Sequence, residues 1–151
     1  MSSQFKPSAG YKEKIIESFN RQGMMKTINA SILSIRPGEI ELEFPYQSNL
    51  TQQHGFIHAG IVSTVLDTAC GYAAFSLMPE NAAVLTIEFK VNLLSPAKGE
   101  RFRAVGKVKK LGKNITVTEG ELFSHVDGGQ KTVATMVATI MSVYDREGVE
   151  Y

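Results

Sequence analysis

One acidic side chain, Asp67, lies in the middle of a long apolar stretch of this sequence. The stretch runs from about Ile57 to Leu77, and no other charged side chain occurs between His58 and Met78. A helix that is apolar on nearly all sides is a buried helix. A buried carboxylate costs free energy unless it is paired, hydrogen-bonded or protonated. Asp67 is therefore the first residue expected to carry chemistry.

The residues that share a helical face with Asp67 are small, and the bulky residues lie on other faces. Small side chains beside an acid leave room for a substrate, and they equally allow another backbone to pack closely. The small set is Gly60, Ser63, Thr64, Gly71 and Ala74, with Ser63 as a candidate substrate contact.

The start of the predicted helix supplies a second element of chemistry. The first amides of a helix have no partner within the helix and lie at the positive end of its dipole. Ala59 and Gly60 follow His58 at this point, and their N–H groups are expected to donate to a carbonyl oxygen and hold an oxyanion. His58 is expected to orient the helix start through hydrogen bonds.

Two other chemistries are less favoured by the spacing. A metal site of His54, His58 and Asp67 would need both histidines on one helical face, and Gly55 with its loop argues against this. Cys70, the single cysteine, follows Asp67 by one turn with no activating base in evident reach, so we predict a small core residue. No metal and no resident cofactor are expected.

The 151 residues and the net charge of +1 indicate one domain with a real core and give no sign of a nucleic-acid partner. The N-terminus lacks the apolar region of a signal peptide, and the apolar stretch contains hydroxyl side chains, so a membrane partner is not expected. A single cysteine excludes an intrachain disulfide and agrees with a cytoplasmic location.

Periodicity predicts one short helix, one long helix and six strands. Turn-forming connections join the strands, which favours an antiparallel sheet packed on one buried helix, an α+β arrangement. We divide the chain into an N-terminal segment (1–23), a domain (24–145) and a tail (146–151). The expected helices are 11–22, ending at Gly23, and 57–77; the expected strands are 27–35, 39–44, 84–94, 102–111, 115–126 and 132–144.

The order of these elements fits a hotdog fold, in which a curved sheet wraps the central helix. His58-Ala-Gly with Asp67 nine residues after the histidine, the run DTACGYAA that begins at Asp67, and the run TIEFKVNLLSPA over 86–97 together resemble the PaaI-type acyl-CoA thioesterases of phenylacetate degradation. The resemblance covers roughly residues 25–143. It implies hydrolysis of an acyl-CoA thioester to a free acid and coenzyme A, with Asp67 as general base or as nucleophile.

The resemblance also implies roles for residues around this motif. Relatives usually have glycine at the position of Ala59, and the methyl group could alter fit or rate. An asparagine that many relatives have six residues before the motif histidine corresponds to Gln52, with Asn49 and Gln53 as substitutes. Thr86 matches a position whose hydroxyl comes from the neighbouring subunit. In the family the active site lies between two protomers, and dimers often pair into tetramers; an unpaired edge strand would favour such pairing.

A basic run is the candidate site for the phosphates of coenzyme A, although it reads equally well as a solvated strand. It comprises Lys107, Lys109, Lys110 and Lys113 around a turn at Gly112, with Arg101 and Arg103 as weaker candidates. Two other functions fit the same fold: a non-catalytic acyl-CoA binding protein or sensor, and a dehydratase that uses His58 and Asp67 as its acid–base pair. The motif spacing fits a thioesterase better, and the acyl group itself cannot be predicted.

Overall fold

The computed structural model describes residues 6–149, so the ends of the predicted N-terminal segment (1–5) and tail (150–151) lie outside the described residues. Helices α1 (Tyr11–Arg21) and α2 (Gly23–Thr27) precede strands β1 (Ser31–Arg36) and β2 (Glu39–Pro45). A 3₁₀ turn, η1 (Ser48–Leu50), leads to helix α3 (Ala59–Phe75). Four strands follow: β3 (Ala83–Leu93), β4 (Arg101–Lys110), β5 (Ile115–Val126) and β6 (Gly129–Val143).

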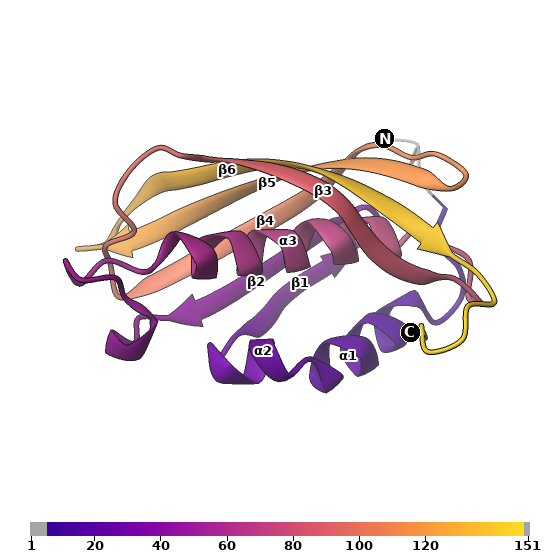
Figure 1. Cartoon of the computed structure of the whole chain (residues 1–151), viewed down its shortest axis with the longest axis horizontal. Helices are drawn as coiled ribbons and strands as arrows, with labels where there is room; N and C mark the ends of the chain where they lie inside the picture. Colours follow the sequence, from indigo (N-terminus) through magenta and orange to yellow (C-terminus); the bar gives the residue numbers. More distant parts are fainter. Residues whose placement is uncertain (1–5, 150–151) are drawn as a thin grey trace.

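The six strands form one antiparallel sheet in the order β1-β2-β4-β5-β6-β3, and the sheet curves around α3 (Figure 1). This confirms the predicted hotdog arrangement. Strand β3 has β6 on one side and forms one edge of the sheet. The core lies between α3 and the concave face, where Val65, Leu66 and Phe75 are fully buried together with Phe44 and Phe102 of the sheet.

Two glycines allow α3 to rest directly on the sheet. Gly106 of β4 is the register partner of Gly120 of β5. A Cβ atom on Gly106 would lie 2.4 Å from the backbone carbonyl of Ala69, and one on Gly120 would lie 2.9 Å from the sulfur of Cys70. The backbone of Ala69 and the side chain of Cys70 therefore lie directly against the backbone of the sheet. This contact fixes the depth of α3 two residues after Asp67.

We predict that Gly106→Ala destabilises the protein by about 3 kcal/mol or more, because the added methyl group meets backbone atoms that cannot rotate away. The free energy of unfolding from chemical denaturation measures the effect. Gly23→Ala in α2 is the matched control, because a Cβ there meets no atom within 4 Å. Equal stability of the two variants would contradict the direct contact between helix and sheet.

The sequence-based expectation was wrong between residues 23 and 30. Gly23 does not end the helical region but begins α2, and the strand predicted from residue 27 begins at Ser31. Met25 and Ile28, three residues apart, are both buried, so a helical turn covers the core here. Asn29, with φ 54°, then turns the chain into β1. The remaining elements agree with the predictions to within three residues.

Helix α1 is part of the same folded body as the sheet. Ile15 and Phe19 are buried in the core cluster that also contains α3. The Lys14 ammonium group donates to the carbonyl oxygen of Pro79 at 3.2 Å and lies 4.1 Å from the centre of the Phe75 ring. Burial lowers the pKa of Lys14. These contacts hold α1 against the C-terminal half of α3.

Candidate functional site

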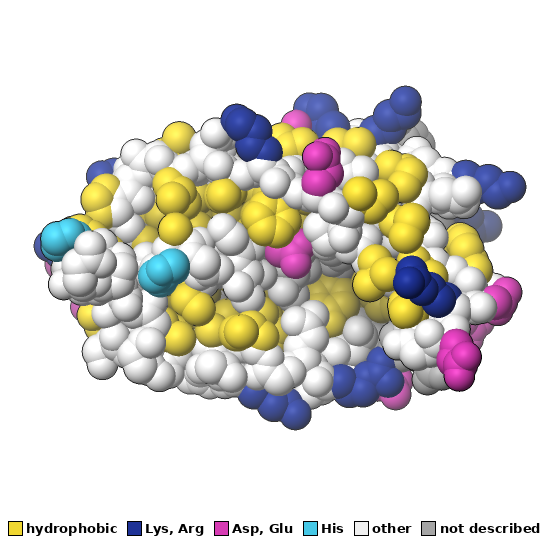
Figure 2. Space-filling model, in the orientation of Figure 1, with side chains coloured by type: hydrophobic (Ala, Val, Ile, Leu, Met, Phe, Trp, Pro, Cys, Tyr) yellow, Lys and Arg dark blue, Asp and Glu magenta, His cyan; other side chains and the backbone are white. Residues whose placement is uncertain are grey.

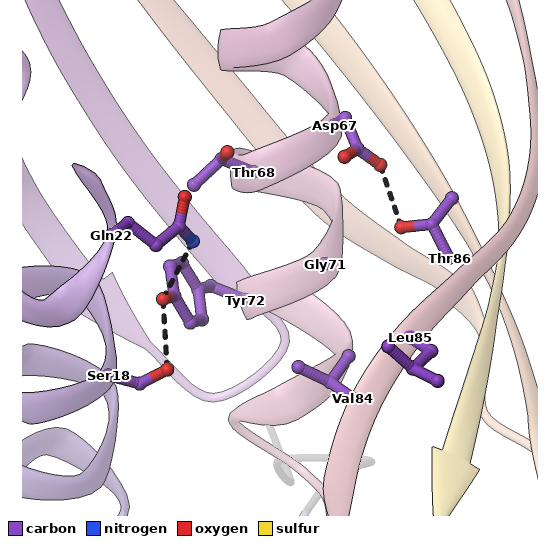
Figure 3. A pocket seen from close by; sticks show the side chains of 9 residues that line it. All are labelled: Ser18, Gln22, Asp67, Thr68, Gly71, Tyr72, Val84, Leu85 and Thr86. Carbon is purple, nitrogen blue, oxygen red and sulfur yellow. Dashed lines mark hydrogen bonds between the residues drawn. The ribbon is translucent and has the colours of Figure 1, made fainter. Parts of the chain in front are cut away.

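The carboxylate of Asp67 is hydrogen-bonded to a hydroxyl group of the adjacent edge strand. Thr86 Oγ1 of β3 donates to Asp67 Oδ1 at 2.7 Å (Figure 3). Both residues belong to one chain, so Thr86 contacts the acid of its own protomer, where β3 runs alongside α3. A role of its hydroxyl in the site of a neighbouring subunit stays a prediction. The pairing of β3 with β6 shifts register between Thr86 and Glu88, an irregularity that can redirect side chains.

The surroundings of Asp67 favour its neutral form more than water does. Asp67 is half-buried, and burial raises its pKa, while the hydrogen bond from Thr86 lowers the pKa in part. Among residues 6–149, no lysine or arginine forms an ion pair with it. A carboxylate with a raised pKa and no cation partner is a stronger base than an ordinary surface aspartate, which suits it to accept a proton from water.

Replacing Thr86 tests this balance. Thr86→Val removes the donor that stabilises the charged carboxylate, so the pKa of Asp67 should rise further. A reaction that needs the ionised form is lost as pH falls through that pKa, and we expect the acid limb of the kcat/KM profile to move to higher pH. Thr86→Ser keeps the hydroxyl group and should leave the limb near its wild-type position. Identical limbs in both variants would contradict the role of this hydrogen bond.

His58 caps the start of α3 with its side chain. His58 Nδ1 accepts a hydrogen bond from the Gly60 N–H at 2.8 Å, and the His58 carbonyl accepts from Ile61 and Val62. The Gly60 amide is therefore engaged, contrary to the expectation that it faces a substrate carbonyl. The Ala59 N–H has no acceptor among the described residues. Of the two predicted donors, Ala59 is the one still available.

Gln52 lies beside this free amide. Its side-chain carbonyl accepts from the backbone N–H groups of His54 and Phe56, which shapes the loop before α3. Its Nε2 amide has no partner among residues 6–149. Gln52 and Ala59 both line a pocket of about 360 Å³ whose apolar walls include Phe56 and Pro96. The pocket thus offers two N–H donors in an apolar setting.

The acid and the free amide belong to different pockets. Asp67 and Thr86 line a separate pocket of about 350 Å³ that has no residue in common with the one at Ala59. Ala59 precedes Asp67 by eight residues on one helix, which corresponds to about 12 Å along the axis. One carbonyl group cannot reach both within a single chain.

Other predicted site residues lie outside both pockets. The Ser63 hydroxyl donates to the Ala59 carbonyl at 2.9 Å and so serves the helix itself. Asn49 lies exposed in η1. Gln53 is exposed, and its Nε2 lies 3.4 Å from the ring nitrogen of its neighbour His54. Ser63 lies one turn before Asp67 on α3 but lines neither pocket, and neither do Asn49 and Gln53.

The predicted basic run lies on the sheet and in the turn after β4. Lys107 pairs with Glu39 at 3.1 Å and Lys109 with Glu119 at 3.3 Å. Lys110 and Lys113 flank Gly112 and are exposed. None of these lysines lines either pocket. The weaker candidates also have acidic partners: Arg101 pairs with Glu43 and Arg103 with Glu41.

Sequence reasoning missed two other lysines. Lys98 and Lys131 line a third depression, which shares Phe56 and Pro96 with the pocket at Ala59. They are 33 residues apart, on a loop and on a different strand, so no local spacing in the sequence connects them. The fold alone places both cations next to that pocket.

The remaining reactive groups give no separate centre. Cys70 is fully buried, and burial raises its pKa to about 12, so its thiol stays protonated near neutral pH. Across the described residues, no group of three or more His, Cys, Asp or Glu side chains could hold a metal ion. None of the helices within residues 6–149 is long and apolar enough to cross a membrane.

Hydrophobic side chains gather on the face of the molecule where β3 and α3 lie (Figure 2). Ile87, Phe89 and Leu93 of β3 are each at least 44% exposed, although they are large and apolar. An edge strand with exposed apolar side chains is a liability unless another chain pairs with it. This face borders the pocket that contains Asp67 and Thr86.

Comparison with known proteins gives consistent matches. Residues 54–129 match the family described as the thioesterase superfamily. A candidate esterase from Halobacterium salinarum is 32% identical over 119 residues, covering 75% of this chain and 78% of that protein. Human acyl-coenzyme A thioesterase 13 is 25% identical over 99 residues, covering 65% and 70%.

Solved structures agree with these sequence matches. A thioesterase family protein from Silicibacter pomeroyi is 56% identical with a TM-score of 0.89, covering 89% of this chain and 99% of that chain. The PaaI protein of the Escherichia coli phenylacetic acid degradation operon is 20% identical with a TM-score of 0.82, covering 96% and 99%. At 20% identity, the similarity to the PaaI protein shows a shared fold.

Proposed function

The chain belongs to the thioesterase superfamily and is a thioester hydrolase of hotdog fold, and from this premise we propose that it hydrolyses acyl-coenzyme A. The observation that carries the proposal is the half-buried carboxylate of Asp67, which has a raised pKa and a hydroxyl partner at 2.7 Å. Such a group can accept a proton from water at a pH where most surface carboxylates are poor bases.

In the proposed reaction, Asp67 removes a proton from water while the water oxygen bonds to the thioester carbon. The carbonyl oxygen becomes an oxyanion, which the Ala59 N–H stabilises, with the Gln52 amide as a second donor. When the carbonyl re-forms, the carbon–sulfur bond breaks, and the thiolate takes up the proton to give the free acid and a thiol. In the alternative route, the Asp67 carboxylate bonds to the thioester carbon and the thiolate leaves, which gives a mixed anhydride; water then cleaves the anhydride, releases the acid and restores the carboxylate. Neither route needs a resident cofactor.

We further propose that two protomers complete one active site. The separation of about 12 Å along α3 prevents Asp67 and Ala59 of one chain from acting on the same carbonyl. A second copy paired along β3 would cover exposed apolar side chains and bring its own helix start to the first protomer's acid. Thr86 then acts within the protomer of Asp67, and the amide comes from the partner. Pairing of dimers into a tetramer stays a proposal of the same kind.

The coenzyme A part of the substrate is supported by the relatives rather than by a phosphate loop in this chain. Human acyl-coenzyme A thioesterase 13 and a medium/long-chain acyl-CoA thioesterase of Escherichia coli are both similar to it. We retain Lys110 and Lys113 as proposed phosphate partners, with Lys109 made less available by Glu119. Lys98 and Lys131 are the alternative cations, because their depression adjoins the pocket at Ala59.

Thiol release from matched thioesters tests the proposal. Each acyl group is presented both on coenzyme A and on N-acetylcysteamine, which lacks the phosphates. We expect hydrolysis of both series, with a lower KM for the coenzyme A series. Equal KM values would reject recognition of coenzyme A while keeping the hydrolase. Tight binding of acyl-CoA without thiol release from any member would favour a binding protein or sensor instead.

A further inference from the structure

A pocket crosses α3 from β3 to α1. Its wall includes Asp67 and Thr86 at one end, Gly71 in the middle, and Ser18, Gln22 and Tyr72 at the other end (Figure 3). The first end is the proposed catalytic carboxylate. At the second end, Ser18 and Gln22 of the α1 region lie next to Tyr72 of α3, away from the catalytic carboxylate.

The middle of the pocket lies over Gly71, and neither the geometry nor the packing of α3 requires a glycine at this position. Gly71 lies in the interior of α3 and is buried, yet a Cβ atom added to it would meet no atom within 4 Å. Glycine inside a helix is less stable than alanine there. The contrast with Gly106 and Gly120 is clear, because their missing side chains make room for protein atoms. The space above Gly71 is left for something outside the chain.

The far end of the pocket is polar but carries no charge. The Tyr72 hydroxyl accepts from Gln22 Nε2 at 2.9 Å and shares a hydrogen bond with Ser18 Oγ at 3.0 Å. That shared bond uses only one of the two hydroxyl protons, so one O–H remains for another acceptor. The Gln22 side-chain oxygen has no partner among residues 6–149. The cluster can therefore give one hydrogen bond and accept another.

We propose that this pocket binds the acyl group of the substrate and selects one that carries a hydroxyl or carbonyl group near its distal end. The inference rests on the proposed thioesterase reaction at Asp67 and adds the substrate class. Tyr72 follows Asp67 by five residues, about 7.5 Å along the axis of α3 and about 140° around it. A chain that joins the two side chains therefore crosses the helix and needs at least about six bonds. A volume of about 350 Å³ holds on the order of ten non-hydrogen atoms, which matches an acyl group of short or medium length.

Gly71→Ala tests the position of the acyl group. The added methyl group enters the pocket and meets no atom of another element within 4 Å, so the variant should melt about 2–4 °C higher than the wild type. The ratio of kcat/KM for hexanoyl over acetyl thioesters should fall at least tenfold. Higher stability with an unchanged ratio would overturn the placement. Because wild-type turnover is measured in the same series, failure of the proposed function is seen separately as absence of thiol release.

Tyr72→Phe tests the distal end with pairs of substrates that differ only in a terminal hydroxyl group, such as hexanoyl and 6-hydroxyhexanoyl thioesters. The wild type should favour the hydroxylated member by at least fivefold in kcat/KM, and Tyr72→Phe should remove most of that preference. Gln22→Met is a second variant of similar size, and Tyr46→Phe, outside the pocket, is the control. No preference in the wild type, or a preference that survives both pocket variants, would overturn the assignment.

Discussion

Asp67→Asn should lower kcat/KM for thioester hydrolysis by about 10²–10⁴-fold, the usual contribution of a positioned general base. The amide has nearly the same shape as the carboxylate, and its oxygen can still accept the hydrogen bond from Thr86. The variant therefore removes the base while preserving the packing of α3. Thiol release at a pH above the acid limb measures the loss.

The same substitution should make the protein more stable near neutral pH. Burial raises the pKa of Asp67 above its value in the unfolded chain. Between these two pKa values, the folded state therefore binds more protons than the unfolded state. The stability that this group contributes is therefore complete below the unfolded-state pKa and is lost as pH rises through the raised folded-state value. Asparagine does not titrate. The variant should therefore have a larger free energy of unfolding than the wild type at pH values above the folded-state pKa of Asp67, and this difference should vanish below the unfolded-state pKa.

Thermal unfolding at several pH values checks the sign of this effect. Asp127→Asn is the matched control, because Asp127 is exposed in a turn with φ 48°, a conformation that asparagine adopts readily. It should change neither activity nor the pH dependence of stability. An Asp67→Asn protein that is inactive and also less stable at neutral pH would indicate a structural carboxylate rather than a base held at a cost in stability.

The central acid could be predicted from sequence because a lone carboxylate in an apolar helical stretch has few physical explanations. The strands could be predicted equally well, since the alternation of apolar and polar residues and the turn-forming residues between strands are local signals. The hydrogen bond between Asp67 and Thr86 of the same chain was not predicted, because pattern similarity does not tell which of two chains supplies a contact. Gly71 was noted as one of several small residues. Only the structure shows that the space beside it is empty, whereas Gly106 and Gly120 pack against α3.

The helix start shows a second limit of sequence reasoning. Ala59 and Gly60 are equivalent in the pattern, since both follow His58 and both have amides without a partner inside the helix. The rotamer of His58 distinguishes them, because its ring nitrogen occupies the Gly60 N–H. Ser18 and Gln22 were not predicted as site residues at all. Their relation to Tyr72 depends on how α1 docks, and no spacing within the sequence encodes that.

Ala59→Pro should lower kcat/KM by about 10²–10³-fold, the effect of removing one oxyanion donor. Proline is well tolerated at the first position of a helix, where it deletes only the N–H group. His58 has ψ 139°, which suits a residue before proline. Thermal unfolding should therefore remain near that of the wild type. Ala59→Ser keeps the amide and is the control for the side chain.

Mixing the two inactive variants should restore activity if two protomers share each site. In a heterodimer of Asp67→Asn and Ala59→Pro chains, one of the two composite sites contains an intact acid and an intact amide, and the other contains neither. With random pairing, half of the dimers are mixed, so about a quarter of the wild-type sites should be recovered. Thiol release after co-expression measures this. Activity that stays at the level of the single variants would mean that acid and amide work within one chain, and the spacing of about 12 Å along α3 would then require a movement of the helix start.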